Sequence, residues 1–302
     1  MNSLQAQFRD VVLLGGLVRP TPLSKSIDRS VLDLPIDGQR SVFDLWHHHL
    51  ATLAQELHHT QLPVRVAIDR QSVVPRIPHG DSPVAITIER DEIGLRGTGG
   101  VLHDLSSEHD DKDYILVANA AQVLLQPLAP MVAELSAANA DVAMISHAYG
   151  IPTSLMLIRC EVLRSIASIG FVDLKEQLLP KITPCRSVRV IHWPHPTGMP
   201  IQTLNGYIQS LRAIASDDKP MDTRLKEDWN STFSIIENGA IVDPSAIVHD
   251  SVVLRGSRVD RNAVIIRSVV CQGAVVKRNS TVTDQLVSPN TTRDRKGGRE
   301  SK

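Results

Sequence analysis

A loop near the start of the chain carries residue types that could bind a phosphate. Gly15 and Gly16 directly follow the apolar run DVVLL, and Arg19 comes three residues later. Glycines let backbone N–H groups approach a phosphate closely, and an arginine can clamp the same anion. The pattern predicts a phosphate-binding loop. A tight turn that binds nothing is an equally simple interpretation of the glycine pair.

A second glycine-rich loop, LRGTGGVLHDL at 95–105, opens a predicted helix. Backbone amides at the start of a helix can hold a phosphate or a nucleobase. A turn that needs its glycines only for its own conformation is the alternative. The residues expected to contact a ligand in this loop are Gly97, Thr98, Gly99 and Gly100.

Strand-like and helix-like runs alternate along residues 10–214, which predicts a layered α/β domain with a mostly parallel sheet. Ligands of such sheets bind beyond the carboxyl ends of the strands. The loop after the buried strand near 114–118 should therefore face the same cleft, and Asn119 is its candidate side chain. The predicted strands cover 10–14, 64–69, 85–90, 114–120, 141–148 and 187–193, the helices cover 41–59, 127–140 and 203–216, and a strand runs into a helix over 154–167.

The tail of the chain contains a six-residue repeat. It reads AIVDPS, AIVHDS, VVLRGS and RVDRNA, slips by one residue at VIIRS and VVCQG, and resumes as AVVKRN and STVTD. Val253, Val259 and Ile265 recur at this period. The period is typical of a triangular coil whose aliphatic residues point inward and whose Asp, Asn, Gly or Ser residues turn the corners. We predict a short solenoid with a packing or assembly role; the alternative is a meander of short strands.

These patterns set the predicted domain boundaries. The α/β domain spans 1–215, and the polar segment 216–232 is a linker. The solenoid covers 233–287, and 288–302 is expected to be a disordered tail.

Composition excludes several classes of protein. The 302 residues include 33 acidic and 32 basic ones, so no global field attracts nucleic acid or an anionic membrane. Three scattered cysteines favour neither a disulfide framework nor a zinc site. The start MNSLQAQFRD is too polar for a signal peptide, and no apolar run approaches the about 20 residues of a membrane span. We expect a soluble, cytoplasmic protein.

Five histidines lie on the predicted helix at 41–59, in WHHHL and LHH. His48 and His59 are separated by about 16 Å along a helix axis, too far to share a metal ion. We interpret the histidines as a solvated helix face. HWPHPTG at 192–198 is interpreted as a proline-rich loop near the mouth of the cleft.

Several segments agree in order and spacing with the motifs of one family. LLGG with Arg19 and PLS is similar to LAGGxGTRLxPLT, and RGTGGVL is similar to GTAGAL. FVDLKEQLLPKI at 171–182 and LNGYIQSLRAIAS are similar to two further motifs, the second of which reads DVGTxxSYxxANxxLL. The chain thus resembles the sugar-1-phosphate nucleotidyltransferases, in particular the ADP-glucose pyrophosphorylase-like members. The tail resembles their left-handed β-helix throughout, so the resemblance covers most of the chain.

The resemblance implies a Rossmann-like nucleotidyltransferase domain followed by a short left-handed β-helix. It implies a reaction of carbohydrate biosynthesis, in which a sugar 1-phosphate attacks the α-phosphorus of a nucleoside triphosphate and pyrophosphate leaves. In the family, Mg²⁺ is held by two aspartates, and an arginine, here Arg19, neutralises the leaving charge. Asp173, Lys175 and Glu176 are expected on the sugar side.

The sequence departs from the family at the metal site. NGD is replaced by NAA, with Ala121 in the place of one aspartate, and DVG is aligned with LNG, with Leu204 in the place of the other. Neither side chain can bind Mg²⁺, so no metal ligand is predicted there. Ser30 or Val31 aligns with the family lysine, and no EKP-like segment follows DVAMISHA. Carboxylates that could substitute, none singled out by spacing, are Asp28, Asp33, Asp37 and Asp104.

Three functions fit these observations. The chain is a diverged nucleotidyltransferase, a silent pseudoenzyme that binds a nucleotide or sugar nucleotide as a regulatory subunit, or an assembly scaffold. The glycines and Arg19 favour a retained ligand over the scaffold. The missing carboxylates favour the silent protein over the enzyme. Self-association through the β-helix is also expected.

Overall fold

The computed structural model describes residues 7–16, 20–91, 97–147, 151–166, 179–217 and 232–289. The chain forms two compact units. Unit 1 comprises Met1–Arg19 and Phe43–Gly198, and unit 2 comprises Pro20–Val42 and Met199–Lys302. The sequence groups Pro20–Val42 with the α/β part, whereas in the structure this segment belongs with the solenoid.

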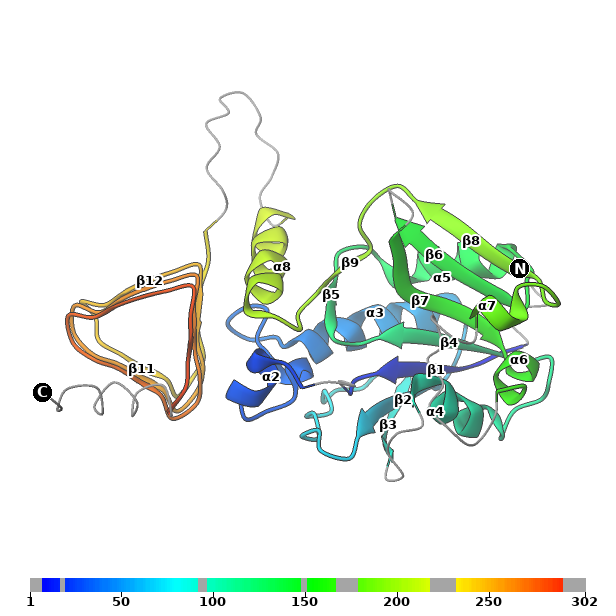
Figure 1. The fold of residues 1–302 in the computed structure, drawn as a ribbon, viewed down its shortest axis with the longest axis horizontal. Helices are drawn as coiled ribbons and strands as arrows, with labels where there is room; N and C mark the ends of the chain where they lie inside the picture. The colour runs from blue at the N-terminus through cyan, green and yellow to red at the C-terminus, as the bar shows by residue number, and fades with distance from the viewer. Residues whose placement is uncertain are drawn as a thin grey trace, which may run out of the picture. The chain divides into compact units, whose positions relative to one another are not determined.

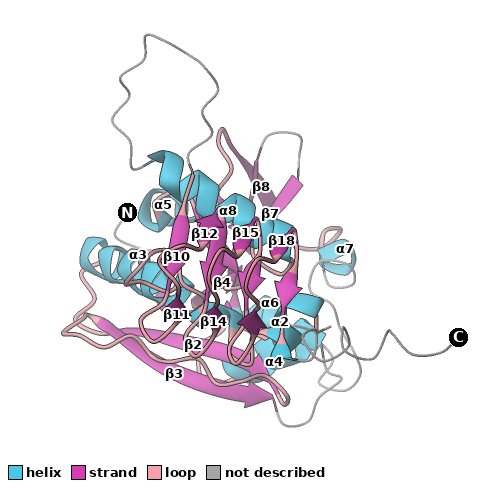
Figure 2. Ribbon diagram, turned by 90° about the vertical axis from the view of Figure 1, so that its left-hand side faces the viewer, coloured by secondary structure: helices cyan, strands magenta, loops and turns pink. Residues whose placement is uncertain are grey.

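Unit 1 is built on a seven-stranded sheet with the order β3-β2-β1-β4-β7-β6-β8. Only β7 runs antiparallel to its neighbours among these seven strands. Figure 2 shows β3 at one edge of the sheet. The strands are β1 (Phe8–Leu14), β2 (Leu62–Asp69), β3 (Val84–Asp91), β4 (Tyr114–Asn119), β6 (Val142–His147), β7 (Ile151–Arg159) and β8 (Val188–Trp193), with two short strands, β5 (Gln122–Leu124) and β9 (Gly198–Pro200), outside this sheet.

Helices cover both faces of the sheet (Figure 1). Leu102 and Leu105 of α4 and Val162 and Leu163 of α6 join the strands in one apolar core on one face. The buried residues of α3 and α5 lie on the other face. Because both faces are covered, the central strands β1 and β4 are almost continuously apolar. The helices of the chain are α2 (Pro22–Ser26), the 3₁₀ helix η1 (Val31–Asp33), α3 (Val42–Glu56), α4 (Gly97–Ser106), α5 (Leu128–Ala137), α6 (Cys160–Arg164), α7 (Leu179–Ile182) and α8 (Leu204–Asp217).

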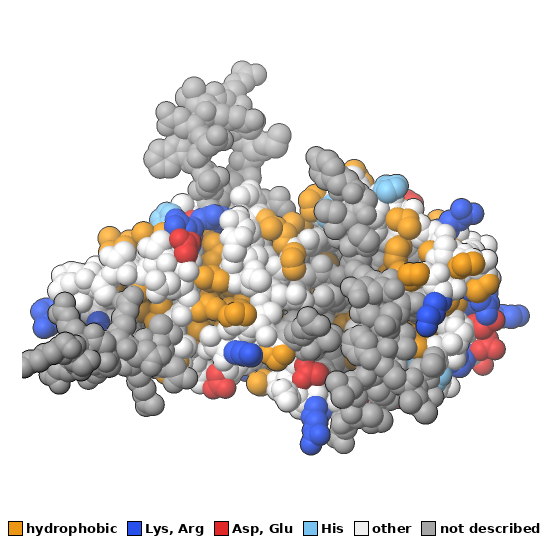
Figure 3. Space-filling view, viewed as in Figure 1, with side chains coloured by type: hydrophobic (Ala, Val, Ile, Leu, Met, Phe, Trp, Pro, Cys, Tyr) orange, Lys and Arg blue, Asp and Glu red, His pale blue; other side chains and the backbone are white. Residues whose placement is uncertain are grey.

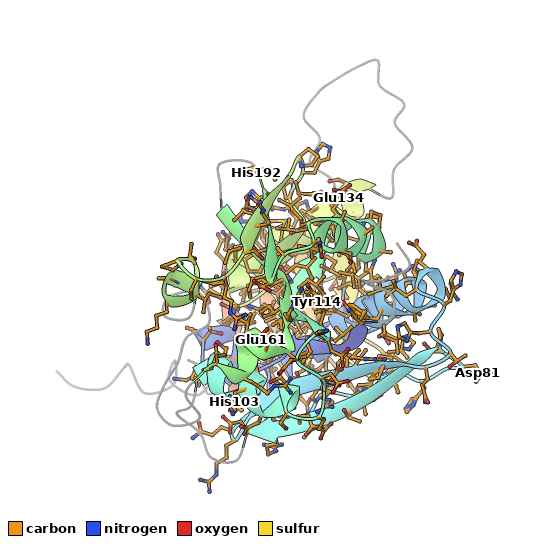
Figure 4. All side chains as sticks on the ribbon, turned by 90° about the vertical axis from the view of Figure 1, so that its right-hand side faces the viewer. Asp81, His103, Tyr114, Glu134, Glu161 and His192 are labelled. Carbon is orange, nitrogen blue, oxygen red and sulfur yellow. The ribbon has the colours of Figure 1, made fainter. Side chains whose placement is uncertain are left out.

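The amino edge of the sheet is held by polar side chains. The Tyr114 hydroxyl, at the start of β4, donates to Ala140 O at 3.1 Å and accepts from Arg159 Nη2 at 2.6 Å. Figure 4 shows Tyr114 in the middle of the side-chain layers and Asp81 at the periphery. Tyr114 therefore links the start of β4 to the end of β7.

Asp10 is a carboxylate in the central strand β1 and is fully buried. Arg65 Nε of β2 lies 2.7 Å from its Oδ2, and His109 Nε2 lies 3.6 Å from the same atom. Burial raises the pKa of Asp10 to about 6, although Arg65 and His109 act in the opposite direction. The folded chain therefore holds a proton on Asp10 more tightly than the unfolded chain does.

This raised pKa predicts a pH-dependent loss of stability. Since the ordinary pKa is 3.8 and the folded value is about 6, the contribution of Asp10 is fully present below about pH 4 and is lost as the pH rises to about 6. Relative to Asp10→Asn, the wild type should lose up to about 3 kcal/mol of unfolding free energy across this window. Urea unfolding at several pH values measures the difference. The exposed Asp81→Asn is the control, and parallel curves for wild type and Asp10→Asn would contradict the raised pKa.

Unit 2 contains the predicted solenoid, a left-handed β-helix. Its strands stack into three parallel sheets, β10-β13-β16-β19, β11-β14-β17 and β12-β15-β18. Figure 1 looks along the coil axis and shows the triangle, and Figure 2 shows β12, β15 and β18 of one side next to one another. The strands are β10 (Ser234–Ile236), β11 (Ile241–Val242), β12 (Ile247–His249), β13 (Ser251–Val253), β14 (Arg258–Val259), β15 (Val264–Ile266), β16 (Val269–Val270), β17 (Val275–Val276), β18 (Thr281–Thr283) and β19 (Leu286–Val287).

Each coil is 17 residues long, one fewer than three six-residue repeats require. The inward residues Val253, Val259 and Ile265 follow at six-residue spacing, and the next, Val270, comes after five. The five-residue step passes through the corner at which Asp250, Arg267 and Asp284 have positive φ angles. The slip seen once in the sequence therefore recurs at the same corner of every coil.

Pro20–Val42 and α8 cover one side of the triangle (Figure 1). Val252 and Val269 face outward on this side and are nevertheless fully buried. Two ion pairs join these segments to the solenoid. Arg29 Nη1 lies 2.7 Å from Glu237 Oε1, and Arg212 Nη2 of α8 lies 2.6 Å from Asp250 Oδ2. Burial of this sheet face explains why Pro20–Val42 belongs to unit 2.

The inward direction of alternate residues predicts the cost of shortening them. Ile265→Ala should lower the free energy of unfolding by about 2–5 kcal/mol, because it leaves a cavity between coils. Val264→Ala, on the outer surface of the same strand, should cost less than about 1 kcal/mol. Chemical unfolding of the full chain compares the two variants. Equal costs would mean that the assigned directions are wrong.

The predicted α/β class, the β-helix and the main strands and helices are confirmed. The short helix α2 was not predicted, although Thr21 and Ser24 form the two reciprocal hydrogen bonds that cap its start. No helix among the described residues is long and apolar enough to span a membrane.

Candidate functional site

The carboxyl ends of six strands share one edge of the unit 1 sheet, because only β7 runs the other way. Leu14, the last residue of β1, pairs with Asn119, the last residue of β4. Since α4 connects the parallel strands β3 and β4, it must run back along the sheet and begin at this same edge. The topology therefore brings Gly15, Asn119 and the start of α4 at Gly97 to one edge.

The loop after β1, at Gly15 and Gly16, packs against the end of β2. The N–H groups of Gly15 and Gly16 both donate to Ala67 O, at 2.8 and 3.1 Å. A Cβ on residue 16 would lie 2.7 Å from the backbone N of Asp69, so only glycine fits there. These two N–H groups thus belong to the hydrogen bonding of the sheet, and their phosphate contact stays a prediction. Arg19 lies outside the described residues.

Asp69 is a residue of this edge that the sequence did not single out. Its Oδ1 accepts from the N–H groups of Gln71 and Ser72, at 2.7 and 2.9 Å, and the Ser72 hydroxyl bonds to Oδ2. The carboxylate closes the turn after β2. A carboxylate that ends a strand before polar residues is a sequence signal for such a turn.

The second loop leads into α4, and its glycines have structural reasons. Gly97 has a φ of +68°, a conformation that favours glycine. Gly99 and Gly100 are buried, and Leu102 anchors the helix in the core. Thr98 is half-buried in the first turn. The alternative of a glycine-requiring turn is thus supported, and the helix start remains oriented toward the carboxyl edge.

The third loop, Asn119–Gln122, is fixed from three directions. Ala120 N–H donates to Leu14 O at 3.0 Å, which ties the loop to β1. Asn119 Oδ1 accepts from Ala121 N–H at 2.9 Å. From α3, the indole N–H of Trp46 donates to both Ala120 O and Gln122 O, each at 3.1 Å. Ala120, Ala121 and Trp46 have no exposed surface.

Trp46 was missed at the sequence level. Its apolar spacing predicts a buried ring on the helix, but the partner carbonyls lie 74 and 76 residues away along the chain. Among the described residues, only Oδ1 of the Asn119 side chain has a hydrogen-bond partner. The Nδ2 amide of Asn119 is therefore a donor that a ligand could use.

The remaining predicted site residues fall elsewhere. Leu204 is the first residue of α8 in unit 2, where Thr203 Oγ1 caps the helix by accepting from Gly206 N–H at 3.0 Å. Asp173, Lys175 and Glu176 lie outside the described residues. Of the substitute carboxylates, three belong to unit 2 and one lies two turns along α4 from Gly97: Asp28, Asp33 and Asp37, and Asp104.

The loop after β4 does not fit a magnesium ion held by a carboxylate at position 121. Ala121 presents a buried methyl group, and Asn119 Oδ1 is bonded to the backbone. Asp69 already accepts three hydrogen bonds within its own turn. Within the described ranges there is no group of three or more His, Cys, Asp or Glu residues that could hold a metal.

Helix α3 ends at Glu56, so three of the five histidines, His47–His49, lie on it, and His58 and His59 follow after its end. This helix face is only partly solvated. His49 is half-buried, and burial lowers its pKa to about 4. On β8, His192 Nδ1 lies 2.9 Å from the hydroxyl of the buried Ser146 on β6. Figure 4 shows His192 at the far side of the unit from His103 of α4.

No family model and no curated protein matches the sequence. Among solved structures, the chain is similar to HddC from Yersinia pseudotuberculosis, with a TM-score of 0.50 and 13% identity over 68% of this chain and 100% of that one. It is also similar to a Bacillus anthracis protein assigned as a glucose-1-phosphate thymidylyltransferase, in complex with sucrose, with a TM-score of 0.50 and 12% identity over 72% and 98% of the two chains. At these identities the likeness shows the fold alone. The chain has a sugar-1-phosphate nucleotidyltransferase-like fold.

Burial of Ala121 predicts what a carboxylate would do in its place. Ala121→Asp should lower the free energy of unfolding by about 3–5 kcal/mol at pH 7, because it buries an unpaired charge. The loss should be smaller at pH 4, where the buried carboxyl is protonated, and Mg²⁺ should not restore stability. Ala133→Asp, exposed on α5, is the control and should cost less than about 1 kcal/mol. Rescue by Mg²⁺ would show that position 121 can serve as a metal ligand, whereas full stability at pH 7 without Mg²⁺ would show that the site tolerates a charge.

Proposed function

We propose that the protein binds a nucleotide or a sugar nucleotide at the carboxyl edge of unit 1 and does not catalyse metal-dependent nucleotidyl transfer. One observation carries the proposal. At the loop after β4, where the resemblance expects a metal aspartate, the chain has the buried Ala121 in a loop closed by its own hydrogen bonds. The fold is retained while this carboxylate is absent.

The proposal of a bound nucleotide is supported by the donors at this edge. Helix α4 begins at this edge, and the positive end of its helix dipole favours phosphate. Asn119, the last residue of β4 at the same edge of the sheet, adds a neutral amide donor. The resemblance adds Arg19 as a phosphate clamp and Asp173, Lys175 and Glu176 on the sugar side.

The proposal of a silent site is supported by the chemistry of the donors. Nucleotidyl transfer builds negative charge on the leaving pyrophosphate, and the family neutralises it with Mg²⁺. Amide donors bind phosphates without a metal, but they do not replace two carboxylates that position the ion. We therefore expect binding that does not need Mg²⁺.

The finer resemblance, to ADP-glucose pyrophosphorylase-like proteins, is part of this proposal. It rests on the β-helix after the α/β unit and on the segment at α8. Thr203 caps α8, and Tyr207 is buried with its hydroxyl donating to Pro35 O at 2.5 Å. With Thr203 and Tyr207 in the places of the Thr and Tyr of DVGTxxSY, Pro200 rather than Leu204 takes the place of the aspartate. Neither alignment supplies a carboxylate.

Self-association through the β-helix stays a prediction. Ile241, Ile247 and Val275 are exposed on the outer surface of the solenoid, between 37% and 65%. Hydrophobic side chains are visible on this surface in Figure 3. This observation favours a contact with another molecule and leaves the number of chains open.

Titration calorimetry tests the proposed function. The purified chain is titrated with ATP, GTP, UTP and dTTP, with and without Mg²⁺, and we expect at least one to bind equally well in both conditions. Binding that requires Mg²⁺ would mean that other carboxylates hold the ion and would restore the enzyme. No binding would leave the scaffold as the better interpretation.

A paired variant makes this test specific to the site. Asn119→Asp keeps the Oδ1 acceptor for Ala121 N–H, removes the Nδ2 donor and adds a charge that repels phosphate. Affinity without Mg²⁺ should fall by about tenfold or more. Asn139→Asp, in the turn before β6 at the opposite edge of the sheet, should bind like the wild type.

A further inference from the structure

The Trp46 indole makes a bifurcated hydrogen bond, in which a single N–H donates to two backbone carbonyls of one loop. Nε1 lies 3.1 Å from both Ala120 O and Gln122 O, and the side chain has no exposed surface. Ala120 is fully buried as well. Without this donor, a buried carbonyl would lose its partner, which a protein interior tolerates poorly.

The contact fixes the direction of the loop. Because the carbonyls of Ala120 and Gln122 both point toward α3, the peptide units between them have little freedom to rotate. The Ala121 N–H lies between these carbonyls and is bonded to Asn119 Oδ1 at 2.9 Å. The orientation of the Asn119 side chain therefore depends on a loop that Trp46 holds from behind.

We propose that Trp46 is a positioning residue for the ligand site at the carboxyl edge. It acts through the loop Asn119–Gln122, and it sets the affinity for a nucleotide by holding the Asn119 amide in place. This inference rests on the proposed function, since the ligand is the nucleotide proposed above. Trp46 itself lies behind the loop and contacts no ligand.

Trp46→Phe is the variant that tests this role, because it keeps an aromatic ring and removes the N–H donor. We expect hydrogen exchange at Ala121 N–H to become about tenfold faster, while the β4 amides of residues 115–118 exchange as in the wild type. Nucleotide affinity should fall by about tenfold by calorimetry. Trp193→Phe, on the edge strand β8, is the matched control and should change neither quantity.

Each other outcome overturns the inference in a recognisable way. Faster exchange throughout the sheet would assign Trp46 a role in core packing only. A loosened loop with unchanged affinity, or an unchanged loop, would end the positioning role and leave the proposed function intact. A wild type that binds no nucleotide would instead remove the proposed function, and this inference with it.

A second measurement does not depend on the folding of Trp46→Phe. In a chain carrying Trp193→Phe and Trp229→Phe, Trp46 is the only tryptophan and reports on its own hydrogen bond. Saturating nucleotide should shift or quench its emission, because the loop it holds contacts the ligand. An unchanged spectrum at a concentration where calorimetry shows saturation would overturn the inference.

Discussion

The junction between β1 and β4 is the contact on which the unit 1 site depends. Ala120 N–H extends the ladder by donating to Leu14 O, so the loop after β4 begins in register with the loop after β1. Buried backbone groups must find partners, and here they find them in β1, in Asn119 and in Trp46. Together these hydrogen bonds fix the path of the loop Asn119–Gln122 at the end of β4. The start of α4 is then brought to the same edge by topology alone.

Most of the fold could be predicted from the sequence because the relevant signals are local. Apolar runs of strand length, broken by turn residues and alternating with helical spacing, are enough to indicate an α/β sheet. The β-helix follows from a period that is short and repeated. The five-residue step between inward residues was harder to predict, because Val253 and Leu254 are both aliphatic and either could point inward. Only the stacking of Val253 under its neighbours decides this.

Much less of the site could be predicted, because its decisive contacts are not local. The sequence indicates which loops end strands, and this places Gly15, Asn119 and the start of α4 at one edge. It contains no sign that Gly16 N–H bonds to Ala67 or that Trp46 bonds to Ala120. Both contacts join segments that only the folded sheet brings together. The location of the site was thus predictable from topology, and the use of its donors was not.

The glycines and the missing carboxylates do not have equal weight as signs of function. Gly16 faces the backbone of Asp69, and Gly97 has a positive φ, so the fold needs both glycines whether or not a ligand binds. The backbone at position 121 does not require a particular residue in this way. Burial there disfavours a carboxylate unless a metal ion compensates its charge. A chain of this fold that no longer uses the metal would keep the two glycines and lose the metal-binding carboxylates. Nucleotide binding must therefore be judged from side chains that the fold does not require, of which the Asn119 amide is the clearest.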